Sequence, residues 1–178
     1  QAQLDALMDD RDTRVVVIAA NGRAFCAGME MQPEDGGHVF GYDHAEGEDI
    51  CVCASVEKAH TDLGAVGEIL NILRDEHGES VGEPVRLDSQ CKYSVVARGQ
   101  ADAYLRLPTR PGYVERIWDH AAGAIIAAES GAAVTDIFGH ELDFTHGRGL
   151  EKNKGVVCAP PRLHGLVLGA IEKLGIGK

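Results

Sequence analysis

Three short segments of this sequence carry polar side chains of the types that hold phosphate groups. They are residues 57–61 (EKAHT), 87–93 (LDSQCKY) and 117–123 (IWDHAAG), and each lies at or near the start of a predicted helix. A helix N-terminus offers unpaired backbone N–H groups and the positive end of the helix dipole, which together favour an anion. Lys92 adds a point charge, and Arg106, at the end of a predicted strand, adds a planar guanidinium. The pattern therefore predicts a phosphate-binding site.

Each of these side chains also has an ordinary structural interpretation. Ser89 can cap its helix, and Lys92 can be a solvated surface residue. His60 can cap a helix or lie on the surface, and Asp119 can stabilise the dipole of the alanine-rich helix that follows it. The spacing Ser89-x-x-Lys92 also matches the nucleophile motif of β-lactamases, but no S-D-N or K-T-G sequence follows it, so we reject that interpretation.

Apolar periodicity predicts the elements that must position these segments. Strands are predicted over residues 50–54, 84–87, 103–107 and 155–159, and helices over residues 62–76, 88–98, 117–130 and 162–174. Asp88 or Ser89 is the expected cap of the second helix. Strands that alternate with helices indicate an α/β domain over residues 50–178, with a layered mixed β-sheet and flanking helices.

The first 49 residues differ from the rest in composition. They carry a net charge of −8 out of the total of −11. Residues 4–10 are typical of a short amphipathic helix, and residues 14–20 form an apolar, β-branched run typical of a buried strand. Residues 32–49 hold six acidic residues and no Lys or Arg, which predicts a linker or loop.

The composition also excludes several classes of protein. No run approaches the roughly 20 apolar residues of a membrane span, and no secretory signal is visible. An acidic chain without a basic stripe is a poor candidate for nucleic-acid binding. The cysteines at 26, 51, 53, 91 and 158 have neither zinc nor thioredoxin spacing. We therefore expect reduced, buried thiols in a cytoplasmic protein with no nucleic-acid and no membrane partner.

The order of short motifs over residues 50–178 resembles the C-terminal half of the 3'(2'),5'-bisphosphate nucleotidases, within the inositol-monophosphatase-like superfamily. The motifs are EKxH, LDSQxKY, YLRLP and IWDHAAG, followed by VTD and LDF. The resemblance implies a magnesium-dependent phosphatase that removes the 3'-phosphate from 3'-phosphoadenosine 5'-phosphate. It also assigns roles to individual residues. Asp119 matches a metal-ligating aspartate, and positions that hold the nucleotide are matched by His60, Ser89, Lys92 and Arg106.

The other metal carboxylates of that family stand in a glutamate pair and a D-P-[IL]-D-G-T motif. No such motif occurs in this sequence. Magnesium takes one or two carboxylates together with phosphate oxygens and water, and metal ions activate the attacking water and clamp the leaving oxygen. We therefore expect low magnesium affinity and weak or absent phosphatase activity from this chain by itself.

Residues 12–31 resemble a different family, the enoyl-CoA hydratases (crotonases). An apolar run leads there into the sequence AFCAGME, in which the backbone N–H of Met29 corresponds to half of an oxyanion hole. Glu30 stands where that family usually has Asp, and a second oxyanion glycine and the catalytic glutamates are absent. A strand and turn kept for packing is the ordinary interpretation, because a single N–H donor without an acid or base cannot run hydration.

The two resemblances together predict a chimera with a crotonase-like fragment at 1–31, a linker at 32–49 and a nucleotidase-like domain at 50–178. Residues 14–20 would then add a strand to an exposed sheet edge, or that edge would pair between copies in a homo-oligomer. Three functions stay open at this point. They are a nucleotidase-like domain that binds adenosine phosphates, a non-catalytic scaffold or homo-oligomer, and a crotonase-like CoA binder.

Overall fold

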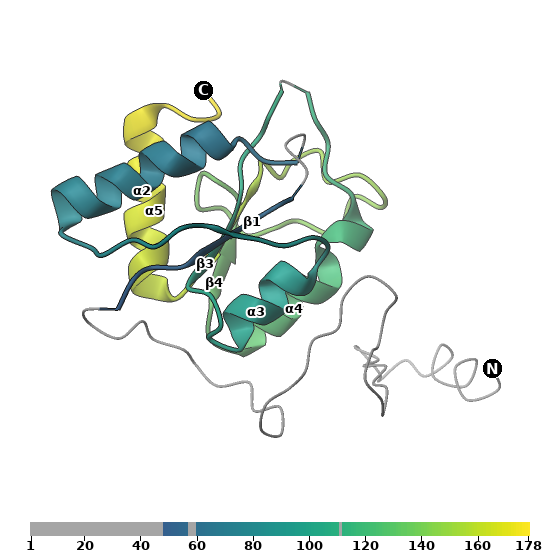
Figure 1. The fold of residues 1–178 in the computed structure, drawn as a ribbon. Helices are drawn as coiled ribbons and strands as arrows, with labels where there is room; N and C mark the ends of the chain where they lie inside the picture. The colour runs from purple at the N-terminus through teal and green to yellow at the C-terminus, as the bar shows by residue number, and fades with distance from the viewer. Residues whose placement is uncertain (1–47, 57–59, 111) are drawn as a thin grey trace. The chain divides into compact units, whose positions relative to one another are not determined.

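The computed structural model describes residues 48–56, 60–110 and 112–178, and these residues form an α/β domain around one mixed β-sheet (Figure 1). The strand order is β2-β1-β3-β5-β4. Strands β2, β1 and β3 run parallel, whereas β5 pairs antiparallel with both β3 and β4. The strands are β1 (Val52–Ala54), β2 (Val85–Arg86), β3 (Ala103–Arg106), β4 (Ala133–Thr135) and β5 (Val156–Ala159).

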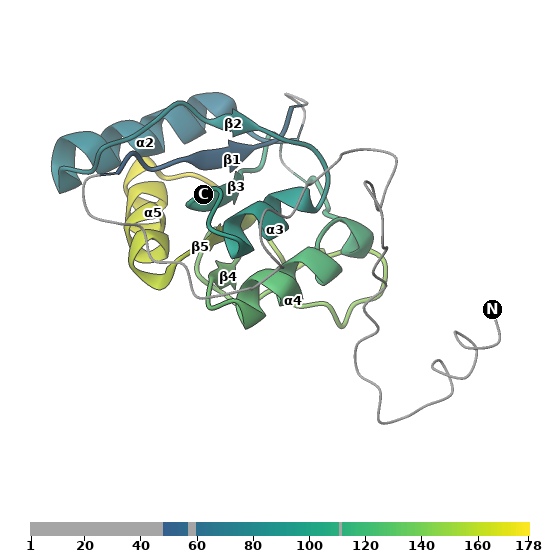
Figure 2. The ribbon, with the colours of Figure 1, turned by 60° about the horizontal axis from the view of Figure 1, so that its bottom comes forward.

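Helices cover both faces of this sheet. Helices α2 (Leu63–His77) and α5 (Pro161–Leu174) pack together on one face, and α3 (Cys91–Ala97) and α4 (Ala121–Glu129) pack together on the other (Figures 1 and 2). A short 3-10 helix, η1 (Ile117–Asp119), precedes α4. The predicted layered α/β architecture with a mixed sheet is therefore confirmed for the described residues.

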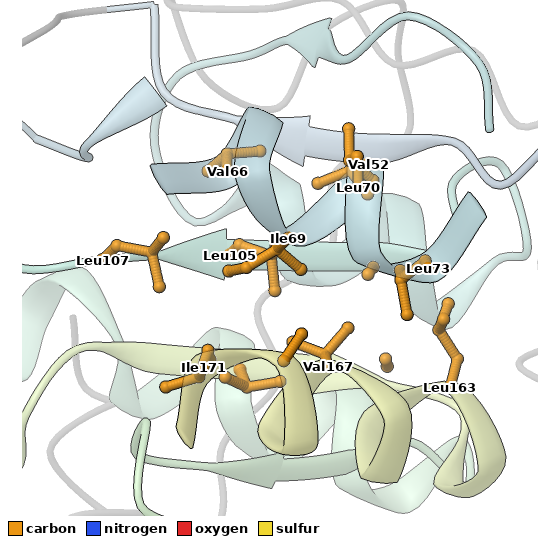
Figure 3. Close-up of a cluster of buried hydrophobic side chains, with 14 of the residues drawn as sticks. Val52, Val66, Ile69, Leu70, Leu73, Leu105, Leu107, Leu163, Val167 and Ile171 are labelled. Carbon is orange, nitrogen blue, oxygen red and sulfur yellow. The ribbon is translucent and has the colours of Figure 1, made fainter. Parts of the chain in front are cut away.

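The central strands β1, β3 and β5 are buried on both faces, so alternate side chains enter two separate cores. Val52 and Leu105 point toward α2 and α5 and join the larger apolar cluster (Figure 3). Cys53 and Tyr104, their neighbours along the same strands, join the cluster beneath α3 and α4. The central strands β1, β3 and β5 therefore contribute side chains to both cores, which explains why their sequences are continuous apolar runs.

The best-predicted helix, α2, has the start and stop signals that its sequence indicates. The side chain of Asp62 caps the helix by accepting a hydrogen bond from the Ala65 N–H at 3.0 Å. Gly78 ends it in the left-handed region at φ 70°, a conformation that glycine adopts without a steric penalty. The prediction of a helix over residues 62–76 is confirmed.

Two predicted helices need correction. Helix α3 begins at Cys91, and its N-cap position is Gln90 rather than Asp88 or Ser89. Ser89 instead lies in the left-handed region at φ 61°, so the chain turns there before the helix starts. The helix predicted over residues 117–130 is interrupted at His120, whose backbone (φ −135°, ψ −42°) separates η1 from α4.

Other predictions fall partly or wholly beyond the described residues. The helix at 4–10, the strand at 14–20, Met29 and most of the 32–49 linker lie outside them. The four described cysteines are free, and the predicted burial holds for Cys53 and Cys158, whereas Cys51 and Cys91 are partly exposed. Burial raises the pKa of both Cys53 and Cys158 to about 12. Among the helices that the structure describes, none is long and apolar enough to cross a membrane.

Packing between α3 and α4 depends on Gly123, and a substitution there tests the fold. A Cβ atom at Gly123 would lie 2.4 Å from Cδ2 of the fully buried Tyr93. We expect Gly123→Ala to lower the free energy of unfolding by about 1–3 kcal/mol, because over-packing must displace a fixed side chain. Chemical denaturation followed by circular dichroism measures this change.

The matched control is Gly67→Ala in α2, where an added Cβ would meet nothing within 4 Å. That variant should be more stable than the wild type by about 0.5–1 kcal/mol, because alanine favours a helix interior. Equal effects of the two substitutions would contradict the proposed close contact between α4 and Tyr93.

Candidate functional site

The polar residues singled out in the sequence line one cavity of about 180 Å³. All five candidates lie there, together with three residues that the sequence did not indicate as site residues. The lining residues are His60, Asp88, Ser89, Lys92, Tyr104, Arg106, Tyr113 and Asp119. The structure therefore brings together side chains that come from four separate segments of the chain.

The parallel half of the sheet explains this convergence, because the carboxyl ends of parallel strands meet at one edge. Strand β1 leads into the loop that carries His60, β2 leads to Ser89, and β3 ends at Arg106. Thr61 fixes the first loop against β3, since its Oγ1 accepts a hydrogen bond from the Leu107 N–H at 2.9 Å. The topology alone thus places three of the candidates side by side.

Lys92 is a buried cation rather than a solvated surface residue. Its Nζ donates hydrogen bonds to the carbonyl oxygens of Leu87 at 3.2 Å and of Ser89 at 2.9 Å, and it lies 5.2 Å from the ring centroid of Tyr104. Burial lowers the pKa of Lys92, and the positive charge of Arg106 lowers it further. These contacts also hold the 87–89 turn, in which Ser89 takes its unusual left-handed conformation.

Arg106 is held by Glu115, an acidic residue that the sequence did not reveal as part of the site. Its Nε donates to Glu115 Oε1 at 2.6 Å, and one Nη donates to the hydroxyl of Tyr113 at 3.2 Å. The other carboxylate oxygen of Glu115 accepts from Nε2 of His120 at 3.1 Å. Although burial by itself raises the pKa of Glu115, the hydrogen bonds from His120 and Arg106 bring it below its ordinary value.

Gln90 joins the two halves of the site and was also missed in the sequence. Its side-chain amide donates to the carbonyl of Trp118 at 2.6 Å and accepts from the N–H of Gly123 at 2.7 Å. These two partners flank Asp119 and His120 on either side. A residue next to Ser89 therefore fixes the loop that carries Asp119, although 28 and 33 positions separate Gln90 from its partners.

Asp119 is half-buried at the end of η1 and lines the cavity. Within the described ranges, no hydrogen bond or ion pair occupies its carboxylate, and this leaves it available to a ligand. The acidic residues of the VTD and LDF motifs, Asp136 and Asp143, have structural roles instead. Asp136 accepts from the N–H groups of Phe138 and His140, and Asp143 accepts from Thr145, so both stabilise their own loops.

The donor set does not amount to a complete magnesium site. Among residues 48–56, 60–110 and 112–178, no group of three or more His, Cys, Asp or Glu side chains is arranged to hold a metal ion. Asp119 fits magnesium as a single ligand, because this cation prefers carboxylate oxygens and keeps several waters.

The lowered pKa of Glu115 predicts a specific dependence of stability on pH. A carboxyl group whose pKa is lower in the folded state stabilises the fold above its ordinary pKa of 4.5. That stabilisation is lost as the pH falls through the lowered folded value. The difference in unfolding free energy between the wild type and Glu115→Gln should therefore be largest near pH 7 and shrink below pH 4.5, as urea denaturation at each pH would show.

The comparison between the two proteins provides its own control, since every other carboxyl group titrates in both. A difference that stayed constant between pH 7 and pH 3 would mean that Glu115 does not carry the stabilising charge.

Solved structures share this fold. The chain is similar to an IMPase from Thermotoga maritima, with a TM-score of 0.55, 20% sequence identity and coverage of 79% of this chain and 47% of that one. It is also similar to an inositol monophosphatase from Anabaena, with a TM-score of 0.54, 17% identity and coverage of 76% and 48%. At these identities the likeness establishes the α/β fold.

Sequence relatives are more similar over a shorter stretch. A 3'(2'),5'-bisphosphate nucleotidase of Emericella nidulans is 47% identical over 125 residues, which are 68% of this chain and 33% of the relative. One from Schizosaccharomyces pombe is 44% identical over 112 residues, which are 63% of this chain and 30% of the relative. The chain thus spans about a third of the length of these curated relatives.

The family comparison reaches further toward the N-terminus than the expected nucleotidase-like domain. The profile described as "Inositol monophosphatase family" matches residues 13–175 and so includes most of the stretch that resembles a crotonase. The comparisons give no support to a crotonase-like fragment or a chimera, and the division at 31 and 49 stays a prediction. Because the family profile matches most of its length, the chain belongs to the inositol monophosphatase family.

Proposed function

We propose that this chain binds an adenosine phosphate in the cavity beside Lys92, Arg106 and Asp119. One observation carries the proposal: two buried cations line a cavity of about 180 Å³ together with a carboxylate that has no partner among the described residues. The bisphosphate nucleotidases to which the chain is similar support a nucleotide as the ligand.

The two cations keep donors available for a phosphate. Lys92 uses hydrogen bonds to two carbonyl oxygens, so one of its three N–H donors is left. Arg106 has five N–H donors, and its hydrogen bonds to Glu115 and Tyr113 leave further donors for a ligand. Hydrogen bonds from such donors to phosphate oxygens are charge-assisted and therefore stronger than neutral ones. His60 and Ser89 would complete the contacts with the nucleotide.

Catalysis needs more than the described residues provide. Asp119 would be one ligand of a magnesium ion, which when bound would polarise the phosphoryl group and activate water. A single carboxylate holds this ion weakly, so we propose that the chain by itself has weak or no phosphatase activity on 3'-phosphoadenosine 5'-phosphate. Its cytoplasmic location also stays a proposal.

Calorimetric titration tests the binding proposal directly. AMP and 3'-phosphoadenosine 5'-phosphate, each with and without magnesium, should both bind to the wild-type chain. Lys92→Met should weaken binding about tenfold or more, because a charge-assisted hydrogen bond contributes about 1.5–3 kcal/mol and 1.4 kcal/mol corresponds to a factor of ten.

The matched control is Lys173→Met, which removes the same charge from α5, on the opposite face of the sheet, where Lys173 pairs with Glu76. Its affinity for AMP should equal that of the wild type. Absence of binding to either nucleotide would reject the proposal in favour of a non-catalytic scaffold, and binding to CoA alone would instead favour the crotonase-like function.

A phosphate-release assay tests the catalytic part of the proposal. We expect little or no phosphate from 3'-phosphoadenosine 5'-phosphate in the presence of magnesium. Any residual activity should disappear in Asp119→Asn, because the amide is a poor magnesium ligand. Turnover as fast as that of a full-length bisphosphate nucleotidase, abolished by Asp119→Asn, would show that the expectation of an incomplete metal centre is wrong.

A further inference from the structure

We propose that Glu115 and His120 are positioning residues that hold the cation of Arg106 and the carboxylate of Asp119 in one fixed arrangement. The inference rests on the proposed function, in which these two groups contact the ligand. Neither Glu115 nor His120 lines the cavity of about 180 Å³ itself. Both would therefore act through their neighbours.

A continuous series of buried hydrogen bonds connects Tyr93, His120, Glu115 and Arg106. The hydroxyl of Tyr93 lies 2.8 Å from Nδ1 of His120. Nε2 of His120 lies 3.1 Å from Glu115 Oε2, and Glu115 Oε1 lies 2.6 Å from Nε of Arg106. The relative exposures are 0% for Tyr93 and His120, 4% for Glu115 and 6% for Arg106, so water has little access to these hydrogen bonds.

The direction of each hydrogen bond follows from the chemistry of the partners. An ionised carboxylate only accepts, so Nε2 of His120 and Nε of Arg106 both donate to Glu115. Nδ1 of His120 pairs with the hydroxyl of Tyr93 at 2.8 Å. Burial raises the pKa of Tyr93, so its hydroxyl keeps the proton that it donates. Each polar group of this series therefore has a hydrogen-bond partner inside the core.

This series of hydrogen bonds ends at Arg106, where it fixes the plane of the guanidinium group that would bind the phosphate. Glu115 holds Nε of Arg106, and Tyr113 holds one Nη. Two contacts on a rigid planar group leave it no freedom to rotate. The donors of Arg106 that remain are therefore oriented before any ligand arrives, which reduces the entropy lost on binding.

The same hydrogen bonds set the position of Asp119, because they hold His120 in a conformation that interrupts the helix. The sequence of residues 117–130 favours one continuous helix, yet His120 takes a non-helical backbone conformation and places its ring in the core. Successive residues of a helix point about 100° apart, so a continuous helix would turn Asp119 to a different direction. The buried hydrogen bonds of His120 thus keep the preceding residue, Asp119, on the wall of the cavity.

A double-mutant cycle on ligand binding separates a positioning role from a general structural one. Affinity for AMP is measured by NMR titration in the wild type, Glu115→Gln, Arg106→Met and the double variant. Because its hydrogen bond to Arg106 is one of the two routes by which Glu115 acts, Glu115→Gln should weaken binding at least tenfold in the wild type and clearly less in the Arg106→Met background. Equal losses in both backgrounds, or no loss in the wild type, would overturn the proposal.

Ser130→Ala is the matched control. It removes another buried hydrogen bond, from Ser130 Oγ to the carbonyl of Ala127, at the end of α4 remote from Asp119. Binding of AMP should change by less than twofold in this variant. Should Glu115→Gln fail to fold, Tyr93→Phe replaces it in the same cycle, with an expected loss of about threefold that again depends on Arg106.

A second measurement keeps this proposal distinct from the proposed function. If the wild-type chain binds no adenosine phosphate, the proposed function fails, and NMR signals of the free protein then decide the positioning role. Glu115→Gln should shift both the Nε–H signal of Arg106 and the backbone amide signal of Asp119, and Ser130→Ala should shift neither. An unchanged Asp119 signal would show that the two groups are not coupled.

Discussion

The carboxylate of Glu115 is buried between a cation and a histidine, and much of the site depends on how its charge is balanced. Removing a carboxylate from water costs several kcal/mol unless its oxygens find good partners. Arg106 occupies one oxygen and His120 the other. Because neither partner can leave without exposing an uncompensated charge in the core, Arg106 and the loop at His120 are held together. The hydrogen bonds of Glu115, which does not itself line the cavity, therefore fix the positions of residues that do.

The sheet supplies the second constraint. Three parallel strands end at one edge, and the loops that follow them must lie next to one another whatever their sequence. The two cores on either side keep β1 and β3 fixed, since Val52 and Leu105 lie in one apolar cluster and Cys53 and Tyr104 in the other. Polar residues at the strand ends then meet without any long-range interaction of their own. Ser89 and Arg106 reach the cavity in this way.

The sequence predicted those parts of the structure that depend on local pattern. The strands at 50–54 and 155–159 and the helix α2 follow from apolar runs, periodicity and caps that lie within a few residues of each other. Strand β4, Ala133–Thr135, was missed because it is three residues long and only half-buried. Gln90, Glu115 and the break at His120 were missed for another reason. Their roles depend on contacts with residues far away in the sequence, which no local pattern contains.

The proposed function requires that a ligand enters the cavity at the ends of the parallel strands. The most direct measurement is a two-dimensional NMR titration of the chain with AMP, in which backbone amide signals report the location of the ligand. Signals of Ser89, Lys92, Arg106 and Asp119 should shift together with a single dissociation constant, while signals of α2 and α5 stay unchanged. Shifts confined to α2 and α5, or no shifts at any concentration of AMP, would contradict the proposed binding site.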